Sequence, residues 1–172
     1  MINRKITRRL EQMRDDGGKY ALLIDGARQV GKTFIVRAFA KAHYDDFIEI
    51  NFLKMKGAAS IFENVEDEKD VLTKLSTFVK RDFKKGKTLV FFDEVQRCPE
   101  AVTYVKFLVE EGSCHYVLSG SLLGVELKNV RSYPVGYMDE VKMYPLDFEE
   151  FVLATGERPA LVEAARDSWT TG

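Results

Sequence analysis

The chain has 172 residues, a length that suits one domain with a sizeable core. Apolar residues make up 45% of it and charged residues 31%, and the net charge of −1 gives no support for a general nucleic-acid-binding surface. Cys98 and Cys114 lack metal-ligand spacing, and His43 and His115 are isolated, so we expect reduced thiols, a cytoplasmic protein and no metal site built from these residues. No long apolar run predicts a membrane span, and the first residues do not resemble a signal peptide.

The first 15 residues predict an amphipathic helix, because apolar residues recur with helical spacing at Ile2, Ile6, Leu10 and Met13. A turn over 16–19 and a strand over 20–25 come next. Because this strand is apolar almost throughout, we expect it to be a central strand of a parallel sheet that is covered on both faces.

A phosphate-binding loop is predicted by the stretch Gly26-Ala27-Arg28-Gln29-Val30-Gly31-Lys32-Thr33, which fits the pattern G-x-x-x-x-G-K-[ST]. It lies between the expected strand and a helix expected to begin at Lys32 and continue to about His43, which is the setting that the pattern requires. The loop N–H groups and the helix dipole favour phosphate oxygens. We expect Lys32 to reach the β- and γ-phosphates and the Thr33 hydroxyl to bind Mg²⁺. The loop, together with Phe34, therefore predicts a nucleoside triphosphate site.

The region between this helix and residue 87 predicts a strand, a short helical turn and a second helix. A strand over 47–52 has mixed polarity, so we place it near the sheet edge, and residues 59–62 suggest a short helical turn. The apolar spacing over 71–83 predicts a helix that ends in the lysine-rich stretch 84–87. We interpret these lysines as a solvated helix cap rather than as nucleic-acid contacts.

The stretch 88–94 is an apolar run that ends in Asp93 and Glu94 and predicts a buried strand with two carboxylates at its C-terminal end. Because the C-terminal ends of neighbouring parallel strands share one crevice, we expect Asp93 beside Thr33, where it holds Mg²⁺ through the hydration shell. Glu94 is then placed to deprotonate the attacking water. This pair favours hydrolysis over binding without turnover, and over a small-molecule kinase.

A helix over 99–111 and a strand over 115–121 complete the expected site. A hydroxyl at the end of this strand can bond the γ-phosphate or the lytic water, which makes Ser119, and less readily Ser121, a candidate. The alternative for Ser121 is a helix N-cap, and each serine can have one of the two roles.

Four blocks of sequence occur in a fixed order, namely 26–33, Phe92-Asp93-Glu94-Val95-Gln96, Leu118-Ser119-Gly120-Ser121 and Tyr144-Pro145-Leu146-Asp147-Phe148-Glu149-Glu150-Phe151. Together they resemble a family of prokaryotic AAA+ ATPases, with Walker A and Walker B motifs, in which the ATPase domain precedes a C-terminal domain of unknown function. The resemblance extends from about residue 4 to residue 151.

The resemblance implies an α/β fold of the three-layer P-loop NTPase class (ASCE/AAA+ type). Its five-stranded parallel sheet would have the order 5-1-4-3-2, with helices on both faces and the last strand at 140–143. Lys32 and Thr33 would be the Walker A residues, Asp93 and Glu94 the Walker B pair, and Ser119 the sensor-1 position. Residues 1–155 would form the ATPase core, and 156–172 would begin a truncated C-terminal region.

The sequence departs from the family pattern shortly before the last expected strand, where Gly136 is followed by Tyr137 instead of arginine. Arg131 is the nearest candidate for an arginine finger, although a solvated loop arginine is the favoured interpretation. An apolar stripe over 161–169 is expected to be partly uncovered.

The sequence as a whole predicts an AAA+ type ATPase that binds ATP with Mg²⁺ and uses hydrolysis as a conformational switch on an unknown protein client. The choice of adenine rests on the resemblance alone. The alternative is a nucleotide-gated interaction module with little or no turnover. A homo-oligomer that forms through the ATP site is compatible with the sequence, and a DNA-associated enzyme has no positive support in the charge balance.

Overall fold

The computed structural model describes residues 4–121 and 134–155. Within them the helices are α1 (Lys5–Asp15), α2 (Lys32–His43), α3 (Glu68–Val79), α4 (Pro99–Glu111) and α6 (Phe148–Ala154), with short 3₁₀ turns η1 (Ala58–Phe62) and η2 (Val95–Arg97). The strands are β1 (Ala21–Asp25), β2 (Asp46–Asn51), β3 (Thr88–Asp93), β4 (His115–Gly120) and β5 (Met138–Lys142).

The five strands form one parallel sheet of order β2-β3-β4-β1-β5. This is the predicted order 5-1-4-3-2 read from the other edge, so the predicted fold is confirmed, including the edge position of β2. In the register, Asn51 is the partner of Asp93, and Asp93 is the partner of Ser119. Three polar side chains are therefore brought together at the C-terminal edge of the sheet.

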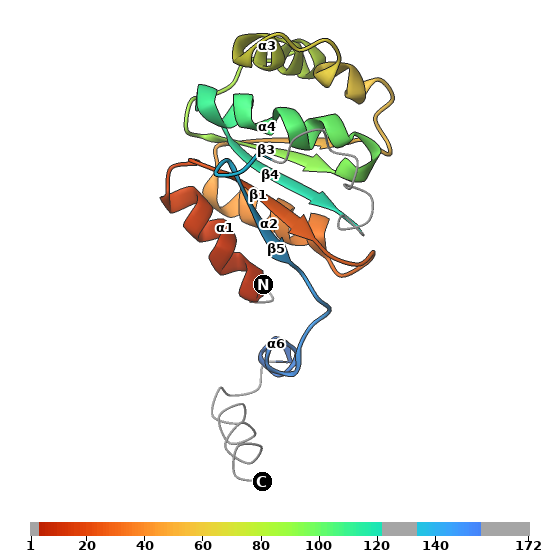
Figure 1. The fold of residues 1–172 in the computed structure, drawn as a ribbon. Coiled ribbons are helices and arrows are strands. Elements are labelled where there is room, and N and C mark those ends of the chain that lie inside the picture. The colour runs from red at the N-terminus through yellow and green to blue at the C-terminus, as the bar shows by residue number, and fades with distance from the viewer. Residues whose placement is uncertain (1–3, 122–133, 156–172) are drawn as a thin grey trace.

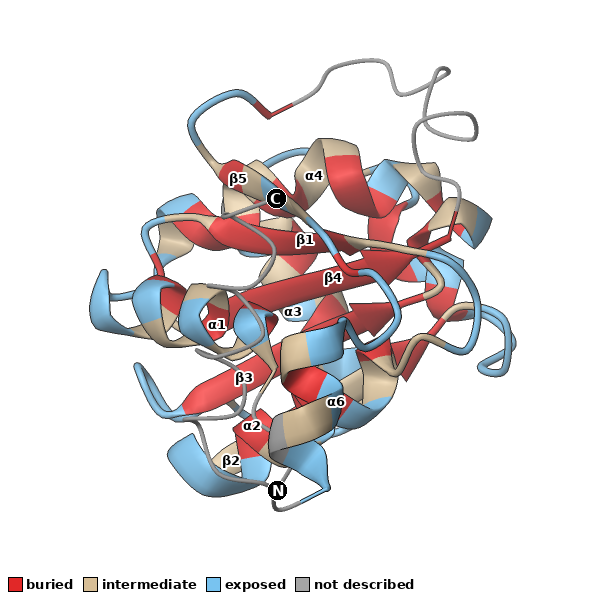
Figure 2. Ribbon diagram, turned by 90° about the horizontal axis from the view of Figure 1, so that it is seen from below, coloured by how far each residue is buried: buried red, intermediate tan, exposed pale blue. Residues whose placement is uncertain are grey.

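Helices cover both faces of the sheet (Figure 1). Alternate strand residues point to opposite faces, so Leu23, Phe92 and Leu118 join the core with η1, α3 and α4. Leu22 and Phe91 lie on the other face and pack with α1 and α2. Figure 2 shows buried residues along the strands between these layers. The apolar sequence of β1 thus results from burial on both sides.

Among the predicted boundaries that differ from the structure are the end of α3 and the start of β5. Helix α3 ends at Val79, not at 83, because Lys80 adopts a left-handed conformation with φ of 56°. The N–H of Lys80 then bonds to the carbonyl of Thr77, and the N–H of Arg81 bonds to the carbonyl of Ser76. Phe83 nevertheless packs against the core, which explains why the apolar spacing continues beyond the helix. Strand β5 begins at Met138, two residues before the predicted strand.

The first turn of α1 is joined to the start of α6 through Glu150, a buried carboxylate. Asp147 and Glu150 cap α6 reciprocally, since each accepts a hydrogen bond from the backbone N–H of the other. Glu150 also accepts the N–H of Lys5 at 2.8 Å and lies 3.2 Å from Nε of Arg4. The guanidinium of Arg4 also donates a hydrogen bond to the carbonyl of Tyr144, at 2.6 Å, in the segment before α6. One side chain therefore serves the N-termini of two helices.

We expect the substitution Glu150→Ala to lower the free energy of unfolding by about 2 kcal/mol, because it removes charge-assisted hydrogen bonds from a buried site. Denaturant unfolding measures this change. Glu149→Ala is the control, since Glu149 pairs with the exposed ammonium of Lys5, and we expect it to cost less than about 1 kcal/mol. Equal effects of the two substitutions would contradict the assignment.

Across residues 4–121 and 134–155, no helix combines the length and the apolar character needed to cross a membrane.

Candidate functional site

The loop over residues 26–33 connects β1 to α2 and has a tightly constrained backbone. Gly31 is the N-cap of α2 with φ of 97°, a conformation that glycine adopts without strain. Gly26 has no room for a side chain, because a Cβ there would collide with the carbonyl oxygen of Met143. Gln29 is left-handed as well, with φ of 67°. The loop therefore curves sharply at the start of α2, as a phosphate-binding loop requires.

Lys32 lies in the first turn of α2 and is buried. Its Nζ donates to the carbonyl oxygens of Gly26 at 2.6 Å and Ala27 at 2.8 Å, so the ammonium bridges the start of the loop. Burial lowers the pKa of Lys32, while the nearby carboxylates of Glu94 and Asp93 act in the opposite direction. A bound phosphate would add full negative charge beside the ammonium and would favour its charged form further.

Asp93 is the centre of the polar cluster and is only 4% exposed. Its Oδ2 accepts hydrogen bonds from Thr33 Oγ1 at 3.1 Å and Asn51 Nδ2 at 2.9 Å. Its Oδ1 accepts from Ser119 Oγ at 2.5 Å and from the backbone N–H of Glu94 at 3.1 Å. Four donors thus satisfy and orient one carboxylate at the junction of the loop with three strands.

The donor set of Thr33 and Asp93 fits a magnesium ion. In the part of the chain that the structure describes, no group of three or more His, Cys, Asp or Glu side chains could hold a metal ion by itself. Magnesium does not need such a group, since it keeps several waters and binds through one or two protein oxygens together with substrate phosphates. A hydroxyl and a carboxylate whose oxygens lie 3.1 Å apart meet that requirement.

Glu94 is the N-cap of the turn η2 and has a left-handed conformation with φ of 61°. The next residue, Val95, is fully buried and anchors the turn in the core, and Glu94 lines the same pocket as residues of the loop. One of its oxygens, Oε2, accepts a hydrogen bond from Gln96 Nε2 at 2.5 Å. The carboxylate is therefore held by a specific contact at the rim of the cluster.

A pocket of about 630 Å³ opens above the loop, lined by Arg28, Gln29, Gly31, Lys32, Thr33, Phe34, Leu53, Glu94 and Arg97. Three cations and one carboxylate face it, which favours a highly charged anion such as a triphosphate. Phe34 and Leu53 are 65% and 59% exposed and supply apolar surface at its edge.

Six of the residues predicted to bind nucleotide line this pocket, namely Arg28, Gln29, Gly31, Lys32, Thr33 and Phe34. The predicted residues Gly26 and Ala27 instead hold Lys32 through their carbonyls, and Val30 packs against the core beside α2.

Of the predicted catalytic and metal-binding residues, Glu94 lines the pocket, whereas Asp93 is buried and is not among the residues that line it. Ser119 is fully buried and bonds to Asp93, so any sensing by Ser119 would pass through that carboxylate; the role stays a prediction. Ser121 is buried as well and accepts a hydrogen bond from Gln96. The arginine-finger candidate Arg131 and the stripe over 161–169 lie outside the described residues.

Four residues of the site are not among those predicted from sequence: Asn51, Leu53, Gln96 and Arg97. Asn51 is the last residue of β2 and the register partner of Asp93. A polar residue at the C-terminal end of a predicted parallel strand could have identified it as a site residue. Gln96 and Arg97 come shortly after Asp93 and Glu94. The directions of their side chains depend on the turn η2, which was not predicted from the sequence.

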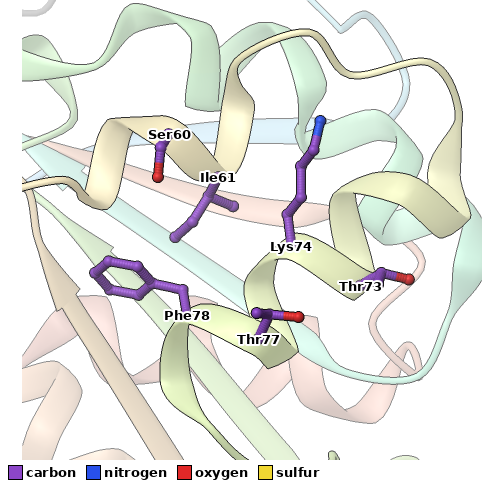
Figure 3. A pocket seen from close by; sticks show the side chains of 6 residues that line it. All are labelled: Ser60, Ile61, Thr73, Lys74, Thr77 and Phe78. Carbon is purple, nitrogen blue, oxygen red and sulfur yellow. The ribbon is translucent and has the colours of Figure 1, made fainter.

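A second hollow, of about 260 Å³, lies between η1 and α3 and is lined by Ser60, Ile61, Thr73, Lys74, Thr77 and Phe78 (Figure 3). Its cation is already used, because Nζ of Lys74 bonds to the carbonyls of Glu63 and Asn64 and to Asp70. The pocket above the loop is therefore the candidate functional site.

Solved structures resemble this fold. A chain of Drosophila ORC bound to DNA is 10% identical with a TM-score of 0.54, and the alignment covers 83% of this chain and 90% of that chain. A chain of Drosophila ORC bound to AT-rich DNA and Cdc6 is 10% identical with a TM-score of 0.53, covering 92% of this chain and 60% of that chain. At this identity the likeness concerns the fold alone.

A comparison with curated proteins finds no match. The family described as AAA domain matches residues 18–152, which contain the loop, the Asp93 cluster and all five strands. Because this match includes most of the chain, the protein belongs to the AAA domain family.

Proposed function

We propose that this domain binds ATP with Mg²⁺ and hydrolyses it. The observation that carries the proposal is the hydrogen bond between Thr33 of the loop and Asp93 of β3, with Glu94 lining the same pocket as Lys32. In this arrangement the phosphate-binding group, the magnesium ligands and a general base converge from two distant segments of the chain.

Each group has a defined task in the proposed reaction. Lys32 and the loop N–H groups bind the β- and γ-phosphates, and Thr33 and Asp93 hold Mg²⁺, which neutralises phosphate charge when bound. Glu94 accepts the proton of a water molecule whose oxygen bonds to the γ-phosphorus. The bond between that phosphorus and the bridging oxygen breaks, and ADP and phosphate leave.

Arg97 is proposed to contribute to ATP affinity from the rim of the pocket. Its guanidinium is exposed and, among the described residues, has no hydrogen bond or ion pair. We expect Arg97→Ala to raise the Kd for ATP about fivefold, as for loss of one exposed ion pair, and to raise the Kd for ADP less. Calorimetric titration measures both constants.

Arg37→Ala is the control, because it removes the same charge from a residue that pairs with Glu49 and does not line the pocket. An equal change in both variants would contradict a specific role for Arg97.

The finer assignment rests on the sequence resemblance. It supports a cytoplasmic, prokaryotic AAA+ hydrolase with its core in residues 1–155 and the start of a C-terminal region in 156–172. ATP binding and hydrolysis would act as a conformational switch on a protein client, and assembly through the ATP site is compatible with the exposed pocket rim of Phe34 and Leu53. A net charge of −1 gives no support for carrying DNA binding over from the ORC chains.

Phosphate release by the wild-type chain at saturating ATP tests the proposal. We expect turnover with Mg²⁺ that is lost with a chelator and falls at least about a hundredfold in Glu94→Gln, as for removal of a general base. Tight ATP binding without phosphate release would instead favour a nucleotide-gated interaction module. Turnover that is unchanged in Glu94→Gln would remove Glu94 from its proposed role.

A further inference from the structure

Gln96 is joined to the proposed general base by a short side-chain hydrogen bond. Its Nε2 lies 2.5 Å from Oε2 of Glu94 and 3.3 Å from Oγ of Ser121. Both partners accept, so the amide nitrogen is oriented from two sides. We propose that Gln96 is a positioning residue that holds Oε2 of Glu94 and leaves its second oxygen to accept the proton of the attacking water; this inference rests on the proposed ATP hydrolysis.

The orientation of the Gln96 amide is set by the charge of Glu94. The opposite orientation would place the amide oxygen against a carboxylate, where the two acceptors would repel each other. In the observed orientation, Oε1 of Gln96 is buried and has no hydrogen-bond partner among the described residues. A buried acceptor without a partner costs free energy. The hydrogen bond between Nε2 and the charged Glu94 must therefore outweigh the cost of leaving Oε1 without a hydrogen bond.

The backbone around Gln96 is fixed independently of this contact. In η2 the N–H of Arg97 bonds to the carbonyl of Glu94 at 2.9 Å, and the N–H of Cys98 bonds to the carbonyl of Val95 at 2.9 Å. Val95 and Cys98 are buried in the core under α4. The base of Gln96 is thus rigid, and its amide can restrain a side chain whose own backbone is left-handed.

The proposed role separates Gln96 from the groups that bind nucleotide. Gln96 does not line the pocket, whereas Glu94 does, so removal of the amide should leave ATP binding intact and misplace the base. Misplacement of a reacting group by a small distance lowers the rate of the chemical step. We therefore expect a change in kcat for phosphate release and none in KM.

The test uses two substitutions, because Gln96→Ala also leaves a void. Gln96→Met keeps an unbranched side chain of similar length and removes only the amide. We expect each to lower kcat about tenfold with KM for Mg-ATP unchanged within about twofold. In combination with Glu94→Gln, neither should lower the residual rate further, since Gln96 acts through Glu94.

The outcomes are distinguishable. A wild-type kcat in Gln96→Met would show that only packing matters and would overturn the inference. A further tenfold loss when either substitution is added to Glu94→Gln would overturn it too, because Gln96 would then act independently of Glu94. Absence of turnover in the wild-type chain would overturn the proposed function and this inference together. Wild-type turnover that Glu94→Gln lowers at least about a hundredfold would leave the proposed function standing in the first two cases.

Discussion

Substitution of Asp93 by asparagine is expected to abolish measurable ATP turnover and to lower the free energy of unfolding by about 3 kcal/mol. Four donors converge on this carboxylate, two on each oxygen. An amide at this position would turn an NH₂ group toward two of those donors and leave them without an acceptor in a buried site. The same change removes the charge that is proposed to hold Mg²⁺.

Denaturant unfolding and phosphate release measure the two effects of Asp93→Asn separately. Asp139→Asn is the control, because Asp139 is a partly exposed strand residue that pairs with Arg9. We expect the control to cost less than about 1 kcal/mol and to keep full turnover. An Asp93→Asn protein as stable and as active as the wild type would contradict the central position given to Asp93.

Lys32→Ala is expected to raise the Kd for ATP at least about a hundredfold, or about 2.7 kcal/mol. Nζ of Lys32 bonds to the loop carbonyls, and the residue is buried although it lines the pocket, so little water screens its charge and its attraction for a triphosphate should be strong. The effect on stability should be small in contrast to Asp93→Asn, because burial lowers the pKa of Lys32 and thus disfavours its charged form in the fold.

Titration of Mg-ATP into the wild-type and Lys32→Ala proteins measures the loss of ATP affinity, with Lys41→Ala as the control. Lys41 is an exposed cation on the same helix, and its removal changes the net charge equally. ATP affinity should be nearly unchanged in the control. Equal affinity of Lys32→Ala and wild type would contradict the assignment of residues 26–33 as the phosphate-binding loop.

The fold was predictable because its signals are local. The apolar character of β1 and β3 indicates burial on both faces, and the pattern of residues 26–33 predicts a tight loop and a helix after β1. The meeting of Asp93 with Thr33 was also predictable, since parallel strands end at a common edge and the loop continues from one of them.

The remaining site contacts depend on register and turn geometry, which a single sequence does not reveal. Asn51 reaches Asp93 only because β2 and β3 pair with those two residues as partners. Gln96 reaches Glu94 because Glu94 is left-handed, a conformation that glutamate rarely adopts. Likewise, Glu150 meets Lys5 across almost the whole chain, although the capping spacing of Asp147 and Glu150 is visible in the sequence.

The most direct test of the proposed hydrolytic site is the identity of the nucleotide that remains bound after incubation with Mg-ATP, since it requires only one turnover. We predict that wild-type protein retains ADP and that Glu94→Gln retains ATP, in equal amounts per chain. Chromatography of the nucleotide released on denaturation distinguishes the two. Recovery of ATP alone from both proteins, or of ADP from both, would contradict the account that Glu94 drives hydrolysis at this site.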